Sequence, residues 1–167
     1  MRSILPTVLV VLAALSCDPT LSRRQRGVQE EVLRNRVTAW ARYVNNQALD
    51  SLAWFYDNTP ELISTWPNGE RLTGWDAERA ALRDMFRDVA TLNLVIQDPT
   101  VRVLDWGAAV VTFRFSMDQV MESVARDVFS GHGTQVWIRD RENAEWRILV
   151  SQASRTPQGP TARVLQP

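Results

Sequence analysis

The chain has 167 residues, which suits one compact domain and leaves no room for a second of ordinary size. Basic and acidic residues balance at 19 each, so no charge excess points to nucleic acid, and a hydrophobic share of 45% excludes a disordered chain. All the basic residues are arginine, and the absence of lysine excludes Schiff-base chemistry.

The first residues have the pattern of an export signal. Arg2 is followed by an apolar stretch at 4–15, which is shorter than the roughly 20 residues that span a bilayer. Ser16, a small residue, then precedes the single cysteine, Cys17. This pattern resembles a bacterial lipobox, which implies a signal peptide at 1–16, a lipid on Cys17 and anchoring in a membrane of the cell envelope. The alternative is a secreted or periplasmic protein with a free thiol.

Polar segments flank the predicted domain. Residues 17–27 are rich in arginine and include Pro19 and Gly27, which is typical of a flexible tether. Residues 157–167 have little to bury and predict a disordered tail. We therefore place one domain at 28–156.

The first half of the domain has helical periodicity. Apolar residues recur at helical spacing over 28–46 and again over 48–56, where Pro60 prevents a continuation. A third helix follows Thr73, with Thr73 and Asp76 as candidate caps. Its apolar stripe consists of Leu82, Met85, Phe86 and Val89.

A hairpin is predicted between the second and third helices, where residues 61–66 and a short strand ending at Thr73 flank Asn68-Gly69. The second half then changes to strand patterning. Further strands are predicted at 92–97, 101–105, 109–117, 128–139 and 146–154. Because no βαβ alternation is present, the order predicts an α+β fold with an antiparallel sheet.

Two segments resemble a known family. NNQALDSLAWFYDNTPELISTWPNGERLTGWDAERAALRDMF is similar to the opening of the nuclear transport factor 2-like superfamily, with the SnoaL-like (polyketide-cyclase-like) branch as the best match. TQVWIRDRENAEWRILVSQAS is similar to its final hairpin. The resemblance implies a cone-shaped cup, also called a cystatin-like roll, in which a strongly curved antiparallel sheet wraps three N-terminal helices around a pocket.

The resemblance does not carry a catalytic residue. In the isomerase members a carboxylate base follows the first strand, but the matching position here, near Thr65, cannot take a proton. A last-strand histidine is frequent in the SnoaL-like branch, where this chain has Val150, Ser151 and Gln152. These departures count against isomerase or cyclase chemistry, and we expect neither a metal nor an organic cofactor.

Alternation along the strands predicts which side chains line the pocket. The apolar residues expected to face the helices are Phe113, Phe115, Val136, Ile138, Ile148 and Val150. On the same parity lie His132, Thr134 and Gln152. Together with Tyr43 and Trp66, they form the predicted ligand-binding set.

The opposite parity predicts the outer face of the sheet. Its expected members are Thr112, Arg114, Gln135, Trp137, Arg139, Arg147 and Leu149. The family often dimerises through this face, so the resemblance implies a homodimer.

Three functions stay open from sequence. The leading expectation is binding of a small apolar or aromatic molecule in the cup. The second is a cofactor-independent isomerase, lyase or hydrolase that uses a water or His132, the single histidine. The third is a protein-interaction module that uses the outer sheet. Asp118, Glu122 and Asp127 could also pair for acid and base work, although a solvated loop explains them better.

Overall fold

A computed structural model describes residues 21–123, 125–140 and 143–157. Cys17, the predicted signal peptide and the predicted tail beyond residue 157 lie outside them. The elements in chain order are α1 (Arg23–Asn45), α2 (Leu49–Leu52), β1 (Ile63–Thr65), β2 (Arg71–Thr73), α3 (Trp75–Asp88), β3 (Val89–Val103), β4 (Ala108–Met121), β5 (Arg126–Arg139) and β6 (Trp146–Arg155).

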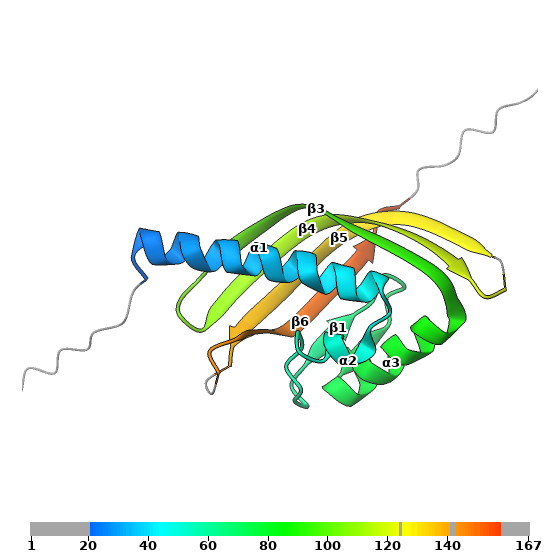
Figure 1. The fold of residues 1–167 in the computed structure, drawn as a ribbon, viewed down its shortest axis with the longest axis horizontal. Helices are drawn as coiled ribbons and strands as arrows, with labels where there is room; N and C mark the ends of the chain where they lie inside the picture. The colour runs from blue at the N-terminus through cyan, green and yellow to red at the C-terminus, as the bar shows by residue number, and fades with distance from the viewer. Residues whose placement is uncertain (1–20, 124, 141–142, 158–167) are drawn as a thin grey trace, which may run out of the picture.

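The strands form one six-stranded sheet in the order β2-β1-β6-β5-β4-β3. Its long strands curve around the side on which the helices lie, as Figure 1 shows, so the predicted α+β cup is confirmed. The pairing of β1 with β6 is parallel, whereas an antiparallel sheet was predicted throughout. The strands predicted at 92–97 and 101–105 are one strand, β3, with a register shift after Gln97.

Helix α1 begins earlier than the predicted start at Val28. Ser22 caps it by accepting a hydrogen bond from the backbone N–H of Gln25. In turn, the side-chain oxygen of Gln25 accepts a hydrogen bond from the backbone N–H of Ser22. Residues 23–27 of the predicted tether are therefore helical. The buried stripe of α1 consists of Leu33, Val37, Ala41 and Val44.

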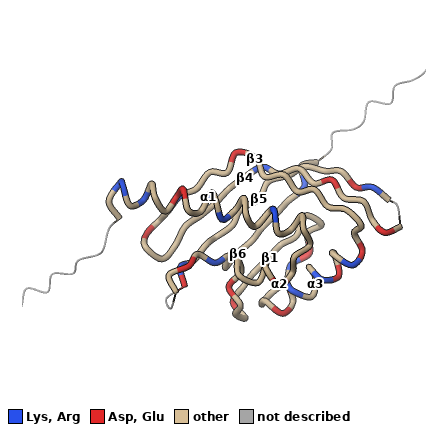
Figure 2. Tube along the Cα trace, viewed as in Figure 1, with Lys and Arg blue, Asp and Glu red and all other residues tan. Residues whose placement is uncertain are grey.

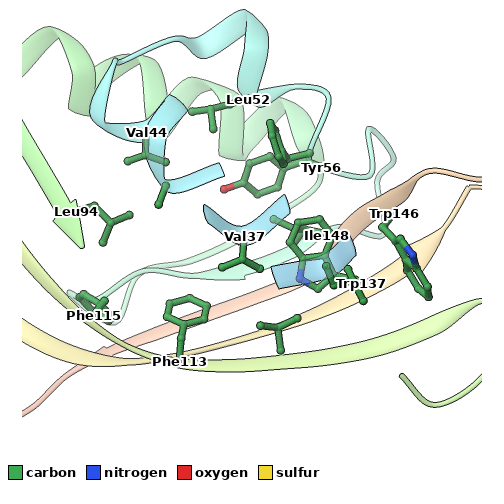
Figure 3. Close-up of a cluster of buried hydrophobic side chains, with 14 of the residues drawn as sticks. Val37, Val44, Leu52, Tyr56, Leu94, Phe113, Phe115, Trp137, Trp146 and Ile148 are labelled. Atoms are coloured by element: carbon green, nitrogen blue, oxygen red, sulfur yellow. The ribbon is translucent and has the colours of Figure 1, made fainter. Parts of the chain in front are cut away.

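The core lies between α1, α2 and the inner face of the sheet. Figure 3 shows Val37 and Val44 above the rings of Phe113 and Phe115, with Tyr56 directing its hydroxyl into the cluster. Trp137, on β5, is fully buried. These side chains account for the position of α1 across the sheet, since burying them is the main favourable term in folding.

The β1–β2 hairpin turns as predicted at Asn68-Gly69, where Gly69 has a φ of 87°. The start of α3 differs from the prediction: neither Thr73 nor Asp76 caps it. Gly74 occupies the N-cap position with a φ of 83°, a conformation that glycine adopts without steric cost.

The predicted parity is right for β4 and wrong for β5. Phe113 and Phe115 are buried, and Thr112 and Arg114 are exposed, as expected. On β5, however, the buried positions are Phe129, Gly131, Gly133, Gln135 and Trp137. His132 and Thr134 are therefore exposed on the outer face of the sheet, together with the half-buried Val136 and Ile138.

Strand β6 changes parity halfway along. Ile148 pairs with Trp137 and Val150 pairs with Val136, so Leu149 is an extra residue that forms a β-bulge. Ile148 faces inward as predicted. Beyond the bulge, Ser151 lies beside the buried Gln135 and faces inward, whereas Val150 does not.

Acidic and basic positions are interspersed over the described elements, as Figure 2 shows. Within the described residues, no helix has both the length and the apolar content needed to cross a membrane.

Candidate functional site

A cavity of about 100 Å³ lies between α1, α3, β1 and the inner faces of β4 and β6. Its wall is mostly apolar and aromatic. The lining residues are Trp40, Val44, Tyr56, Ser64, Thr65, Trp66, Pro67, Glu78, Leu82, Met85, Leu94, Phe113, Phe115, Met117, Ser151, Gln152 and Ala153.

One carboxyl group, that of Glu78, lies in this wall. The Glu78 side chain comes from α3 and the residue is 3% exposed. Its Oε2 atom accepts a short hydrogen bond from the Ser64 hydroxyl and another, of 3.0 Å, from the indole N–H of Trp66. Strand β1 and the residue after it thus hold one carboxyl oxygen from the opposite side of the cavity.

Tyr56 also acts on the carboxyl group. The indole N–H of Trp40 donates to the Tyr56 hydroxyl oxygen at 3.1 Å. Because an indole N–H can only donate, the Tyr56 proton stays available to an acceptor, and the hydrogen-bonding influence of the phenol lowers the pKa of Glu78. Trp40, Tyr56 and Glu78 therefore belong to one polar cluster.

Burial dominates the electrostatics of this group. Desolvation raises the pKa of Glu78 above its ordinary value, the hydrogen bonds from Ser64, Trp66 and Tyr56 act in the opposite direction, and the charge of Glu70 raises it slightly further. Burial likewise holds the pKa of Tyr56 well above its usual range. Among the described residues, no arginine or histidine lines the cavity or forms an ion pair with Glu78.

Sequence reasoning missed Glu78, although a signal was present. Glu78 is one turn before Leu82 and shares the face of α3 that buries Trp75 and Leu82. A carboxylate on the apolar face of an amphipathic helix is rarely buried without a specific partner or role. The predicted apolar stripe begins at Leu82 and runs toward the C-terminus of the helix, so it does not include Glu78.

The structure brings two of the five predicted ligand-binding residues to the cavity. Trp66 is half-buried in the wall, and Gln152 is exposed and lies at its border. His132 and Thr134 are on the outer face, and the ring of Tyr43 packs against Phe55 with 5.6 Å between centroids. None of these last three lines the cavity.

The predicted carboxylate cluster lies elsewhere. Asp118 accepts a hydrogen bond of 2.8 Å from Arg126, which lowers the pKa of Asp118, and Asp127 pairs with Arg155 at 2.7 Å. Glu122 is exposed at the β4–β5 turn. These acids are therefore ion-paired or solvated at the far end of the sheet. In the described part of the chain, no three His, Cys, Asp or Glu side chains group as metal ligands.

Comparison with known sequences gives no assignment: no family model and no curated protein matches the chain. Solved structures do resemble it. A protein of the nuclear transport factor 2-like superfamily from Salmonella enterica serovar Typhimurium superposes with a TM-score of 0.71 at 18% identity, over 82% of this chain and 97% of that one.

Other solved structures with this architecture have diverse names. A putative dehydratase of the NTF2-like family from Streptomyces avermitilis has a TM-score of 0.69 at 15% identity, over 79% of this chain and 99% of its own. The association domain of C. elegans CaMKII has a TM-score of 0.61 at 12% identity, over 77% of this chain and 97% of its own. At these identities the likeness establishes the fold and leaves the chemistry to the site itself.

Proposed function

Because the chain has the nuclear transport factor 2-like fold, we propose that it binds a small, largely apolar molecule in the cavity between its helices and its sheet. The observation that carries this proposal is the composition of the cavity wall, in which aromatic and aliphatic side chains surround one polar cluster centred on Glu78. Ligand sites in proteins have this combination, with apolar walls for affinity and few polar groups for orientation.

The size of the cavity limits the ligand. A dry engineered cavity of about 150 Å³ is enough to hold benzene. A cavity of about 100 Å³ therefore suits a molecule built around a single small ring, with any remaining part extending past the exposed Gln152.

Native mass spectrometry of the full-length protein tests this proposal. We expect a defined additional mass that is lost under denaturing conditions. As a control, Leu82→Trp, which fills the cavity from α3, should remove the additional mass without unfolding the protein. If the wild-type mass is that of the bare chain and a library of single-ring compounds gives no shift in melting temperature, the proposal is wrong.

A second candidate is a cofactor-independent enzyme, an isomerase, lyase or hydrolase acting in the same cavity. The observation in its favour is Glu78, because a carboxyl in a cavity wall whose pKa is raised by burial is a candidate general acid or base. Glu78 replaces His132 in this role, since His132 lies on the outer face. Conversion of the co-purified molecule by wild-type protein, lost in Glu78→Gln, would support it, and recovery of the molecule unchanged would contradict it.

We also propose that the protein forms a homodimer through the outer face of its sheet. Val110, Val136 and Val150 lie in register on three neighbouring strands, and their side chains alternate with those that face the core. Three apolar side chains in a row on a sheet face favour burial against a second surface. Association domains among the solved neighbours are compatible with this proposal.

For the N-terminus we propose lipid attachment at Cys17, with residues 1–16 removed. The supporting pattern is Arg2, the apolar stretch at 4–15 and Ser16 before the cysteine. Labelling of cells with a palmitate analogue should mark the wild-type chain and not the Cys17→Ser variant. An unlabelled wild-type chain would favour a secreted or periplasmic protein.

A further inference from the structure

We propose that the ligand carries a positive charge, and that Glu78 anchors it as the counter-ion: the cavity takes a small cyclic or aromatic amine in its ammonium form. This inference rests on the proposed binding function and adds the chemical class of the ligand.

The hydrogen bonds around Glu78 are those of an acceptor. Ser64 donates its hydroxyl and Trp66 its indole N–H to Oε2, and Tyr56, whose hydroxyl accepts from Trp40, also favours the ionised form of Glu78. An ionised carboxylate offers about four acceptor positions and donates nothing. Both bonds from Ser64 and Trp66 end on the same oxygen, so acceptor positions remain for a donor from the ligand.

The described part of the chain supplies no counter-ion for this carboxylate. Among the described residues, Glu78 forms no ion pair, and the other charged side chain that acts on it is a second carboxylate, Glu70. A buried charge that lacks an opposite charge is costly, and the cost falls when a partner of opposite sign is bound. Of the residues that the structure describes, no arginine or histidine lines the cavity to take this place, so the missing charge is one that the ligand can bring.

Aromatic rings around the carboxylate also favour a cation. Trp40, Tyr56 and Trp66 all line the cavity, and all three belong to the hydrogen-bond network of Glu78. The face of an aromatic ring attracts a cation, most strongly for tryptophan and when the cation has lost its water. An anion would meet the like charge of Glu78, and a neutral ligand would leave the carboxylate uncompensated.

Matched probes can separate the charge of the ligand from its shape. Benzylamine, a cation at neutral pH, and benzyl alcohol, its neutral analogue of similar size, would each be titrated into the full-length protein by calorimetry. We expect benzylamine to bind at least about tenfold more tightly than benzyl alcohol, which corresponds to roughly 1.4 kcal/mol.

Two matched carboxylate substitutions locate the anchor. In Glu78→Gln the preference for the amine should fall to about one. Glu70→Gln makes the same chemical change at an exposed hairpin position and should keep the preference. Near-ultraviolet circular dichroism checks that each variant is folded.

A measurement on the wild-type protein avoids dependence on the Glu78→Gln variant. If the side-chain carboxyl carbon of Glu78 is followed by ¹³C NMR, benzylamine should lower the pKa of this group, and benzyl alcohol should not lower it.

The possible failures are distinguishable. If neither probe binds, the proposed binding function fails and this inference fails with it. If both bind equally tightly, binding in the cavity stands and the inference about charge is wrong. A preference for the amine that survives in Glu78→Gln, or a Glu78 titration that benzylamine does not change, would also overturn the role of Glu78.

Discussion

The phenyl ring of Phe113 lies over Gly133 on the neighbouring strand, so close that a Cβ atom at Gly133 would come within 2.3 Å of the ring. Phe115 and Gly131 repeat this relationship, with a distance of 2.7 Å. The two glycines that flank His132 thus leave the space that the two rings need. Both rings line the cavity, so its shape depends on the absence of side chains at these positions.

We predict that Gly133→Ala destabilises the protein. Its Cβ would overlap the Phe113 ring, and forcing extra atoms into a packed core typically costs about 1–3 kcal/mol. Urea unfolding measures the change. Gly27→Ala is the control, because no atom lies within 4 Å of a Cβ there and glycine in a helix is about 0.5–1 kcal/mol less favourable than alanine. Equal effects of the two substitutions would contradict the packing argument.

Asn45, at the end of α1, covers the edge of the sheet. Its amide donates to the carbonyl oxygen of Leu94 at 2.9 Å and accepts from the Leu94 N–H at 2.6 Å. Strand β3 is an edge strand, so these backbone groups have no neighbouring strand to pair with. Asn45→Ala should lower the free energy of unfolding by about 1–3 kcal/mol, measured by urea denaturation.

The control for this prediction is Asn46→Ala, one residue later and exposed. It should change the stability by less than about 0.5 kcal/mol. If Asn45→Ala changes the stability no more than Asn46→Ala, the two hydrogen bonds do not contribute as we infer.

Glu78 should make stability depend on pH. Burial raises its pKa in the folded state, and unfolding returns it to the ordinary value. The folded state therefore binds the proton more tightly, so this contribution is fully present below the unfolded pKa and is lost as the pH rises through the folded pKa. Across that window the stability of the wild type should fall relative to Glu78→Gln. Parallel curves for the two proteins from about pH 4 upward would rule this out.

The indole of Trp66 should lower the pKa of Glu78. Its indole N–H donates to Glu78 at 3.0 Å and so favours the ionised form. Trp66→Phe keeps the ring and removes the donor, and we expect the pKa of Glu78 to rise further, as measured by ¹³C NMR. Trp54→Phe, at a residue that is 64% exposed, should leave the titration unchanged. An unchanged or lower pKa in Trp66→Phe would count against this role of the indole.

The proposed dimer depends on Val136, the middle residue of the outer valine row. A charge placed there would have to be buried without a partner in the interface, which is costly. Val136→Asp should therefore reduce the mass measured by light scattering from dimer to monomer. Glu122→Gln, at the exposed β4–β5 turn, should keep the dimer. A monomeric wild type at micromolar concentration would refute the proposal.

Much of the fold could be predicted from sequence because its signals are local. The stripe of α1 follows the helical period, and Asn68-Gly69 specifies a tight turn by its own conformational preference. Phe113 and Phe115 alternate with the polar residues Thr112 and Arg114, so the sequence alone predicts which side chains of β4 face the core.

What could not be predicted depends on neighbours in space. The inward face of β5 has the aromatic residues Phe129 and Trp137 near its two ends, and these were a signal for its parity. Between them lie Gly131 and Gly133, which do not look like core residues until the aromatic rings of β4 are seen to lie over them. Val136 and Ile138 are apolar and were therefore predicted to face the helices, but they lie on the opposite face of the sheet. The polar partners of Glu78 come from α1, the segment after α2, and β1 and its following residue, a combination that only the assembled fold reveals.

The bulge at Leu149 has a consequence for how the binding site can change. Residues before it, such as Ile148, fill the core, whereas Ser151 and Ala153 beyond it line the cavity. A single strand thus carries two inward-facing series that are offset by one residue. Substitutions beyond the bulge can therefore alter ligand selectivity with little effect on the packing that holds the fold together, while deletion of Leu149, the extra residue, would leave Ile148 in the core and Ser151 at the cavity and remove only the bulge between them.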